Sequence, residues 1–198
     1  KTPFQNNYEV SLEGYYKEMT GLIEYKEGTN FFGNSSDWQE NIETGGKGTS
    51  YGVEFLIQKK VGRLTGWIGY TWSKTSRQFD NLNFGKEFPY KYDRRHDIGI
   101  AAIYKIKDHI NFSASWVYGT GNAVTLATAK YPAHPNGSTY SSYNGSLINV
   151  YEGRNGFRMR SYHRLDFSFS FIKKRKWGET SFNVGAYNAY SRRNPYFY

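Results

Sequence analysis

The most constraining feature of the chain is a stretch near its C-terminal end in which apolar and polar residues alternate. Residues 165–171 read Leu-Asp-Phe-Ser-Phe-Ser-Phe. Successive side chains of a strand point to opposite faces, so this alternation predicts a strand with one aromatic face and one polar face. The pattern recurs at 8–14, 66–72 and 110–118. Segments of about ten alternating residues, separated by turn residues, are typical of a transmembrane β-barrel.

Composition is compatible with this class. The chain has 198 residues and no cysteine, which excludes a disulfide framework and a thiolate metal site. Its mean hydropathy of −0.76 is low for a membrane protein, but half of each barrel strand faces a polar lumen. No apolar run is long enough for a transmembrane helix. The chain begins Lys-Thr-Pro, without an initiator Met or a signal peptide, and we expect it to be a piece of a longer protein.

The spacing of turn residues predicts an all-β fold of about seven antiparallel strands. The strands are expected near residues 8–18, 49–59, 64–78, 94–105, 110–118, 158–172 and 180–190. Short connections at 60–63, 106–109 and 173–179 alternate with long ones at 19–48, 79–93 and 119–157. Outer-membrane barrels have short periplasmic turns and long extracellular loops. The sequence therefore predicts both the fold class and the direction of each strand.

Basic residues are concentrated at the short connections. A large share of the net charge of +9 lies at these connections, where the basic residues are Lys59, Lys60, Arg63, Lys105, Lys107, Lys173, Lys174, Arg175 and Lys176. A basic rim beside an anionic phospholipid leaflet is one interpretation. Solvated turns without a partner are a second. Binding to nucleic-acid phosphates is a third, but it is disfavoured because these residues lie in turns and not across a strand face.

Aromatic residues gather near the ends of the expected strands. Toward the long loops we expect Tyr15, Tyr16, Tyr51, Tyr70, Trp72, Trp116, Tyr118, Tyr187 and Tyr190. Toward the short turns we expect Tyr8, Tyr104, Phe171 and Trp177. Two aromatic belts that flank an apolar band are expected where a barrel meets the two membrane interfaces. The alternative is that aromatic residues are simply common in strands.

Four motifs carry a family resemblance. Residues 48–55 read Gly-Thr-Ser-Tyr-Gly-Val-Glu-Phe, and 64–73 read Leu-Thr-Gly-Trp-Ile-Gly-Tyr-Thr-Trp-Ser. Residues 92–96 read Tyr-Asp-Arg-Arg-His, and 187–195 read Tyr-Asn-Ala-Tyr-Ser-Arg-Arg-Asn-Pro. In this order they resemble the late barrel strands of TonB-dependent outer-membrane receptors, in the form found in Bacteroidetes.

The resemblance implies a barrel of about 22 strands in the outer membrane of a Gram-negative bacterium, closed by an N-terminal plug. It implies import of a scarce ligand, such as an iron chelate, cobalamin, a glycan or a peptide. Energy would come from TonB with ExbB and ExbD, reached through an N-terminal part. Residues 1–198 would form the C-terminal portion of the barrel, with one more strand after Tyr198. Outer-membrane lipid, lipopolysaccharide and a surface lipoprotein are the other expected partners.

Signals for catalysis are weak, and we expect neither an enzyme nor a bound cofactor or metal. The four His show no metal-ligand spacing. Asp93 with His96, or His163 with Asp166, could form half of a hydrolytic site. Arginines crowd both pairs, and ion pairs that stabilise the strand ends explain them more simply.

The long loops and the strand ends beside them are the expected ligand site. Aromatic residues suited to stacking on sugars or chelates are Phe31, Phe32, Trp38, Tyr90 and Tyr92. Arginines suited to anionic ligand groups are Arg77, Arg94, Arg95, Arg158 and Arg160. Packing of loop on loop is the alternative for each of them. Active transport is the predicted function, and a passive porin or a structural or adhesion barrel is the alternative, which the presence of a plug would decide.

Overall fold

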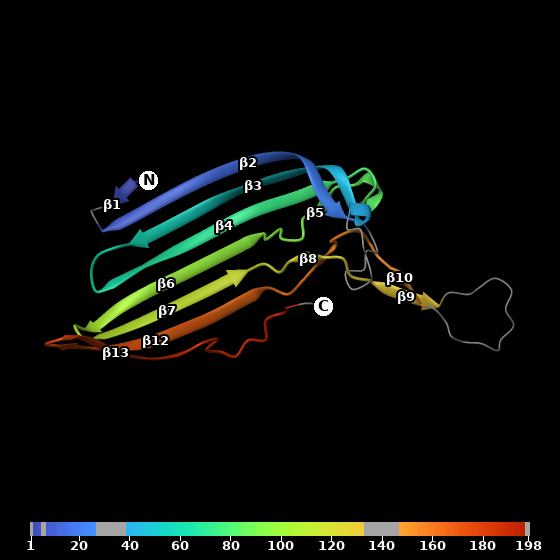
Figure 1. Cartoon of the computed structure of the whole chain (residues 1–198). Helices are drawn as coiled ribbons and strands as arrows, with labels where there is room; N and C mark the ends of the chain where they lie inside the picture. Colours follow the sequence, from blue (N-terminus) through green and yellow to red (C-terminus); the bar gives the residue numbers. More distant parts are fainter. Residues whose placement is uncertain (1, 5–6, 27–38, 133–146, 197–198) are drawn as a thin grey trace, which may run out of the picture.

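The structure is a computed structural model that describes residues 2–4, 7–26, 39–132 and 147–196. Seven long strands form one antiparallel sheet and run side by side (Figure 1). Their bounds are β2 Tyr8–Tyr25, β3 Ile42–Lys59, β4 Leu64–Gln78, β6 His96–Lys107, β7 Ile110–Gly119, β12 Tyr162–Arg175 and β13 Gly178–Ala186. The sheet order is β1-β2-β3-β4-β6-β7-β12-β13, so each long strand pairs with the next long strand along the chain. The predicted all-β antiparallel fold is confirmed.

The remaining elements are short. Strand β1 (Thr2–Phe4) extends the sheet beside β2, and β5 (Phe88–Pro89) pairs with the end of β4. Two small ribbons lie beyond the sheet. They pair β8 (Ala123–Val124) with β11 (Phe157–Arg158), and β9 (Ala129–Pro132) with β10 (Leu147–Val150). Single 3-10 turns occur at η1 (Gln39–Asn41) and η2 (Asn83–Gly85). None of the helices in the described part of the chain could span a membrane.

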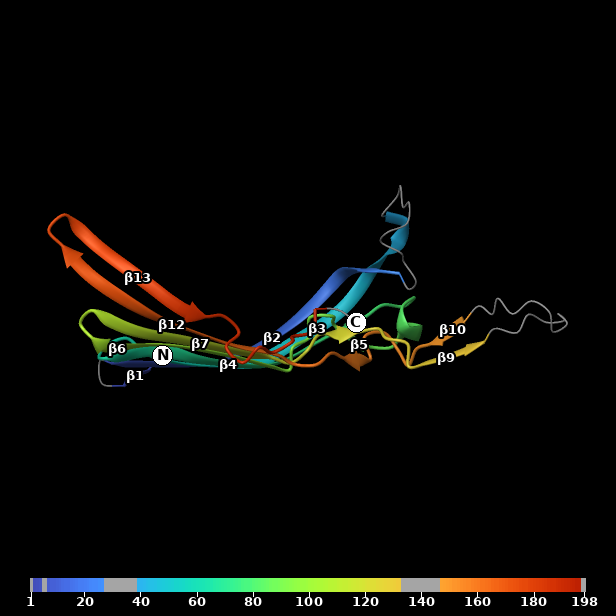
Figure 2. The same cartoon turned by 90° about the horizontal axis from the view of Figure 1, so that it is seen from below.

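Short and long connections lie at opposite ends of the sheet. The strand bounds leave 60–63, 108–109 and 176–177 as the short turns at one end. The long connections 26–41, 79–95 and 120–161 join the strands at the other end, and the described part of 120–161 contains both small ribbons. Figure 2 shows the sheet as a curved layer, with the β12–β13 hairpin and the far ends of β2 and β3 rising on the same side. The predicted alternation of connection lengths is confirmed.

The first hairpin is longer than predicted. Pairing of β2 with β3 continues past Met19 to Tyr25 and Ile42, through two register shifts. Gly21 (φ 67°) and Gly45 (φ 76°) take left-handed conformations that a β-bulge can use. The bulges interrupt the period-two pattern, and this explains why the alternation ended the predicted strand at residue 18. At the other end of the chain, 157–158 pair with β8 and not with β7, so β12 begins four residues later than expected.

The registers align the apolar faces of neighbouring strands. Phe169 lies opposite Phe112, which lies opposite Tyr104. Directly opposed residues of an antiparallel pair project to the same face, so these rings form a continuous row. The ring centres of Phe112 and Phe169 are 5.0 Å apart. On the opposite face the hydroxyls of Ser113 and Ser168 lie 2.8 Å apart. The alternation therefore produces one apolar and one polar face across the sheet.

The apolar face is exposed. Leu12 is 71% and Phe182 66% accessible, and neither face of the sheet is covered by a second layer in the described part of the chain (Figure 2). Among the described residues, the buried apolar side chains that pack together are only Phe79, Leu82 and Phe88, at the long-loop end. A sheet with one uncovered apolar face is what a membrane-spanning barrel wall requires. That this face contacts lipid is a prediction.

Candidate functional site at the long-loop end of the sheet

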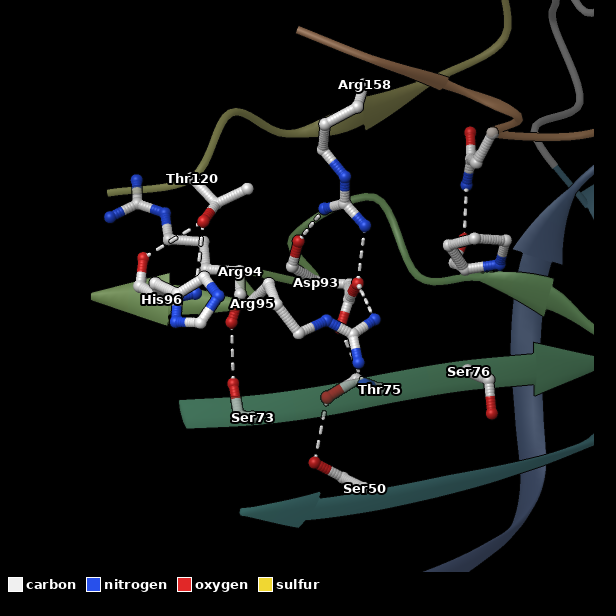
Figure 3. A network of polar contacts seen from close by, with 12 residues as sticks. Ser50, Ser73, Thr75, Ser76, Asp93, Arg94, Arg95, His96, Thr120 and Arg158 are labelled. Carbon is white, nitrogen blue, oxygen red and sulfur yellow. Dashed lines mark hydrogen bonds and ion pairs between the residues drawn. The ribbon is translucent and has the colours of Figure 1, made fainter. Parts of the chain in front are cut away.

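A buried carboxylate organises the end of the sheet that carries the long loops. Asp93 is 1% exposed and accepts hydrogen bonds from three segments (Figure 3). Arg158 donates through Nη2 at 2.6 Å, and Arg95 through Nη2 at 3.3 Å. The backbone N–H of Thr75, on β4, donates at 2.7 Å. A carboxylate this deeply buried is tolerated because it is paired with charge and hydrogen-bonded.

Arg158 joins two loops that are distant in sequence. Besides the Asp93 carboxylate, its guanidinium donates to the backbone carbonyls of Asp93 and Gly121, the latter at 3.2 Å. Strand β11 therefore attaches the 120–161 connection to the 79–95 connection. A methyl group added at Gly121 would lie 2.0 Å from the carbonyl oxygen of Met159. This close approach of the backbones explains the glycine at this position.

A second ion-pair cluster lies beside it. Glu24, near the end of β2, receives Arg77 at 2.9 Å and Arg154 at 3.4 Å. The guanidinium of Arg77 lies 3.8 Å from the ring centre of Tyr90, within the range of a cation–π contact. The backbone N–H of Arg154 donates to the side-chain oxygen of Asn83 at 2.9 Å. Through these contacts three segments from different parts of the chain are fixed together.

The loop that contains the buried apolar residues has an unusual backbone at two positions. Phe79, Leu82 and Phe88 are each 2% exposed. Asn83 and Phe84 follow Leu82 with positive φ values of 52° and 56°. A bulky side chain in this conformation is strained, yet Phe84 is 95% exposed. The packed residues below hold the loop in a defined shape and direct one aromatic ring into solvent.

The structure brings most of the predicted arginine and tyrosine residues together. Arg95 and Arg158 share Asp93, and Arg77 lies on Tyr90. Tyr92 packs edge-on against Tyr90, with ring centres 5.5 Å apart. The three arginines form ion pairs with carboxylates of the protein, as expected if these residues pack loop on loop. They therefore form a frame for the loops before any ligand is considered.

The other predicted residues are more open. Arg94 pairs with Asp97 at 3.1 Å, but both side chains are about half exposed. Arg160 is exposed, and Tyr92 is 58% exposed. Phe31, Phe32 and Trp38 lie outside the described residues. The ligand-binding role of all ten residues is still a prediction. The partners Glu24, Asp93 and Arg154 were not predicted as part of the site.

Aromatic side chains form a belt across the apolar face below the loops. Ring-centre distances of 5.9 to 6.4 Å link Tyr51 with Trp72 and with Tyr16. Further along the sheet the contacting pairs are Tyr70 with His96, Trp116 with Tyr118, Tyr118 with His163, and His163 with Tyr190. This agrees with the expected belt at the long-loop end, with two histidines added.

Two of the expected belt residues belong to the opposite face. Tyr15 lies directly opposite Gly52 in the β2–β3 register, one residue out of phase with the belt residue Tyr16. Tyr187 has its hydroxyl against Arg164, which belongs to the polar face. The placement of Tyr15 and Tyr187 in the belt was therefore wrong, because nearness to a strand end was considered without the parity of the position.

The candidate hydrolytic pairs do not form catalytic arrangements. His163 contacts Tyr190 on the apolar face, whereas Asp166, three residues along the strand, projects to the polar face. Asp93 is paired with arginines. The Nδ1 atom of His96 is hydrogen-bonded to the hydroxyl of Tyr70, 2.9 Å away. No group of His, Asp and Glu suited to a metal ion occurs among the described residues.

The family of the chain follows from a match along nearly its whole length. A model of the family described as TonB dependent receptor-like, beta-barrel, matches residues 2–189. The chain belongs to this family. No curated protein matches the chain. TonB-dependent receptor barrels are outer-membrane transport proteins of Gram-negative bacteria. Within the described residues the sheet is open, because β1 and β13 do not pair.

Proposed function

We propose that the protein containing this chain actively imports a scarce ligand across the outer membrane, with energy supplied through TonB. The ligand class is an iron chelate, cobalamin, a glycan or a peptide. The observation that carries the proposal is the family match over residues 2–189. The division of the sheet into an apolar and a polar face supports it, since a transport barrel needs a lipid-facing and a lumen-facing surface.

We further propose that these residues form the C-terminal portion of a larger barrel. An open sheet edge presents unpaired backbone groups, which are too costly to leave in lipid. Strand β13 is exposed along nearly its whole length and offers such an edge. Additional strands would pair with it and with the β1–β2 side. A plug and a segment that contacts TonB, and through it ExbB and ExbD, would belong to the same protein.

The proposed ligand site is the surface above the arginine frame. Tyr92, Arg94 and Arg160 are exposed and offer one ring and two cations. Phe31, Phe32 and Trp38 would contribute further rings from the first long loop. Arg77, Tyr90, Arg95 and Arg158 would hold the loops in place, because their charges and rings are already engaged. Such a division is common where rigid elements position binding loops. Lipopolysaccharide, or a surface lipoprotein that caps the barrel, would contact the outer loop surfaces.

The test is uptake by cells that carry the full-length receptor, with and without a functional TonB. The probes are a radiolabelled ferric siderophore, cobalamin, an oligosaccharide and a peptide. We expect one of them to accumulate only when TonB and the proton-motive force are present. Equal uptake in both strains would support a passive pore. Surface binding of a probe without any uptake would support an adhesion barrel.

The loop residues are tested in the same assay. Replacing Phe31, Phe32 and Trp38 together by Ala should weaken capture of the transported probe at least tenfold, since stacking contributes about 1 kcal/mol or more per ring. The matched control is Trp177→Ala, which removes an 83% exposed ring at the opposite end of the sheet. Unchanged capture by the triple variant would remove these residues from the site.

A further inference from the structure

The short-turn end of the sheet differs from the loop end in how its cations are partnered. Of the cations at the three short turns, only Lys60 has a carboxylate within ion-pair distance among the described residues, Glu9 at 2.5 Å. At the loop end, Arg77, Arg95 and Arg158 each contact a buried or half-buried carboxylate, although Lys86 and Lys130 have no such partner among the described residues. Unpaired cations in excess create a positive potential that attracts anions. This end of the sheet therefore has charge available for a partner.

Part of this charge surrounds a hollow. The hollow has a volume of about 720 Å³ and lies between the β6–β7 turn and the β12–β13 hairpin. Its apolar side is formed by Phe171 and Phe182, which are opposed in the register, with ring centres 6.3 Å apart. Lys173 and Arg175 follow Phe171 at every second position of β12. They therefore share its face, at intervals of about 7 Å along the strand.

The remaining charges of the hollow leave it positive. Lys174, from the alternate position, and His109 also line it. One carboxylate, Asp108, is present. Across the hairpin, Lys173 is opposed by Thr180, which is uncharged and can donate from its hydroxyl. Glu179 is opposed to Lys174 and not to Lys173 or Arg175.

We propose that this hollow is a binding site for an anionic phospholipid of the periplasmic leaflet. The phosphate and glycerol of the headgroup would contact Lys173 and Arg175, and the acyl chains would follow Phe171, Phe169 and Phe182 into the membrane. The proposal rests on the outer-membrane barrel of the proposed function, in which short turns face the periplasm, and not on transport.

The order of the side chains along β12 favours this ligand over a soluble anion. Rings come first and cations follow toward the turn, so the site matches a molecule with an apolar and an anionic end. A cation also lies beside a ring at the short turn 60–63, where the ammonium of Lys59 is 5.2 Å from the ring centre of Tyr8. Long basic side chains keep their stems on apolar surface and their charges at the interface. Free inorganic phosphate has no apolar part that could contact the rings.

The experiment uses the full-length receptor in detergent, to which phosphatidylglycerol or phosphatidylethanolamine is added at equal concentration. Bound lipid is counted by native mass spectrometry. We expect preferential retention of phosphatidylglycerol. The variant K173Q/R175Q should bind it roughly tenfold to thirtyfold less, since each basic residue at a membrane surface contributes about 1 kcal/mol. The conservative variant K173R/R175K should retain binding.

The matched control is K86Q/K130Q, which removes the same charge from the long-loop end and should bind like the wild type. Heat-dependent mobility in gels verifies that every variant is folded. Equal retention of the two lipids, or unchanged binding by K173Q/R175Q, would overturn the proposal. So would displacement of the lipid by millimolar inorganic phosphate, which would indicate a site for free anions. None of these outcomes depends on uptake, so the lipid-site proposal and the transport proposal are tested independently.

Discussion

At the scale of single residues, Asp93 has the largest consequence for the loop end. Its carboxylate is buried, and its partners come from β4, from its own loop and from β11 (Figure 3). Removing one partner of a buried ion pair leaves the other charges without compensation. Here Arg95 and Arg158 are each about one third exposed, so water reduces that penalty.

We predict that Asp93→Asn destabilises the loop end by about 2 kcal/mol while the strands remain paired. Two arginines would lose their carboxylate, and the 120–161 connection would lose its attachment to β4. The measurement is protease cleavage within 120–161 together with urea unfolding in detergent. Asp97→Asn is the control, because the half-exposed pair of Arg94 and Asp97 contributes less than about 1 kcal/mol to stability. Equal protection of Asp93→Asn and wild type would show that the cluster does not hold the loop.

This cluster shows where the sequence stops being informative. Arg158 and Asp93 are 65 residues apart, and no periodicity relates them. Crowding of arginines near Asp93 was visible in the sequence, and it predicted ion pairs in general. Which arginine meets which carboxylate depends on how the two long connections fold back onto β4. The same holds for Glu24, which lies in a region where β-bulges obscure the strand pattern.

At the scale of the strands, alternation carries most of the information. A side-chain period of two fixes which residues share a face once the strand is recognised. Phe167, Phe169 and Phe171 share a face, as expected, and Ser168 and Ser170 take the other. The ends of the strands were predicted less well. Tyr25 and Ile42 still pair although the sequence around Gly21 and Gly45 has lost the alternation.

We predict that Phe169→Arg destabilises the barrel by about 2–4 kcal/mol if the position lies near the bilayer midplane. The cost arises because a charge would enter lipid. Ser170→Arg, one residue further along β12, is the control and should cost much less, since its side chain projects from the polar face. Unfolding of the full-length receptor in lipid vesicles gives both values. Spin labels at 167 and 169 should report lipid, and a report of water at both positions would refute the assignment.

At the scale of the whole molecule, two properties divide the sheet along one axis. Connection length, and the ion-pair clusters of Asp93 and Glu24 at one end only, distinguish the long-loop end from the short-turn end among the described residues. The first of these could be predicted from turn residues alone. The second needed the structure, because the same basic residue types occur at both ends and only the fold shows which of them have partners. A protein with two such unlike ends has a defined direction in a membrane.

We predict that the long-loop end lies outside the cell and the short-turn end in the periplasm. Epitope tags inserted within the connections 26–41 and 120–161 of the full-length receptor should bind antibody on intact cells. A tag at 175, where β12 ends and the turn at 176–177 begins, should be reached only after the outer membrane is permeabilised. Long loops of outer-membrane barrels are extracellular and short turns periplasmic. Gel mobility controls for folding of each tagged protein. Labelling at 175 on intact cells, with both loops unlabelled, would reverse the direction and move the proposed lipid site to the wrong leaflet.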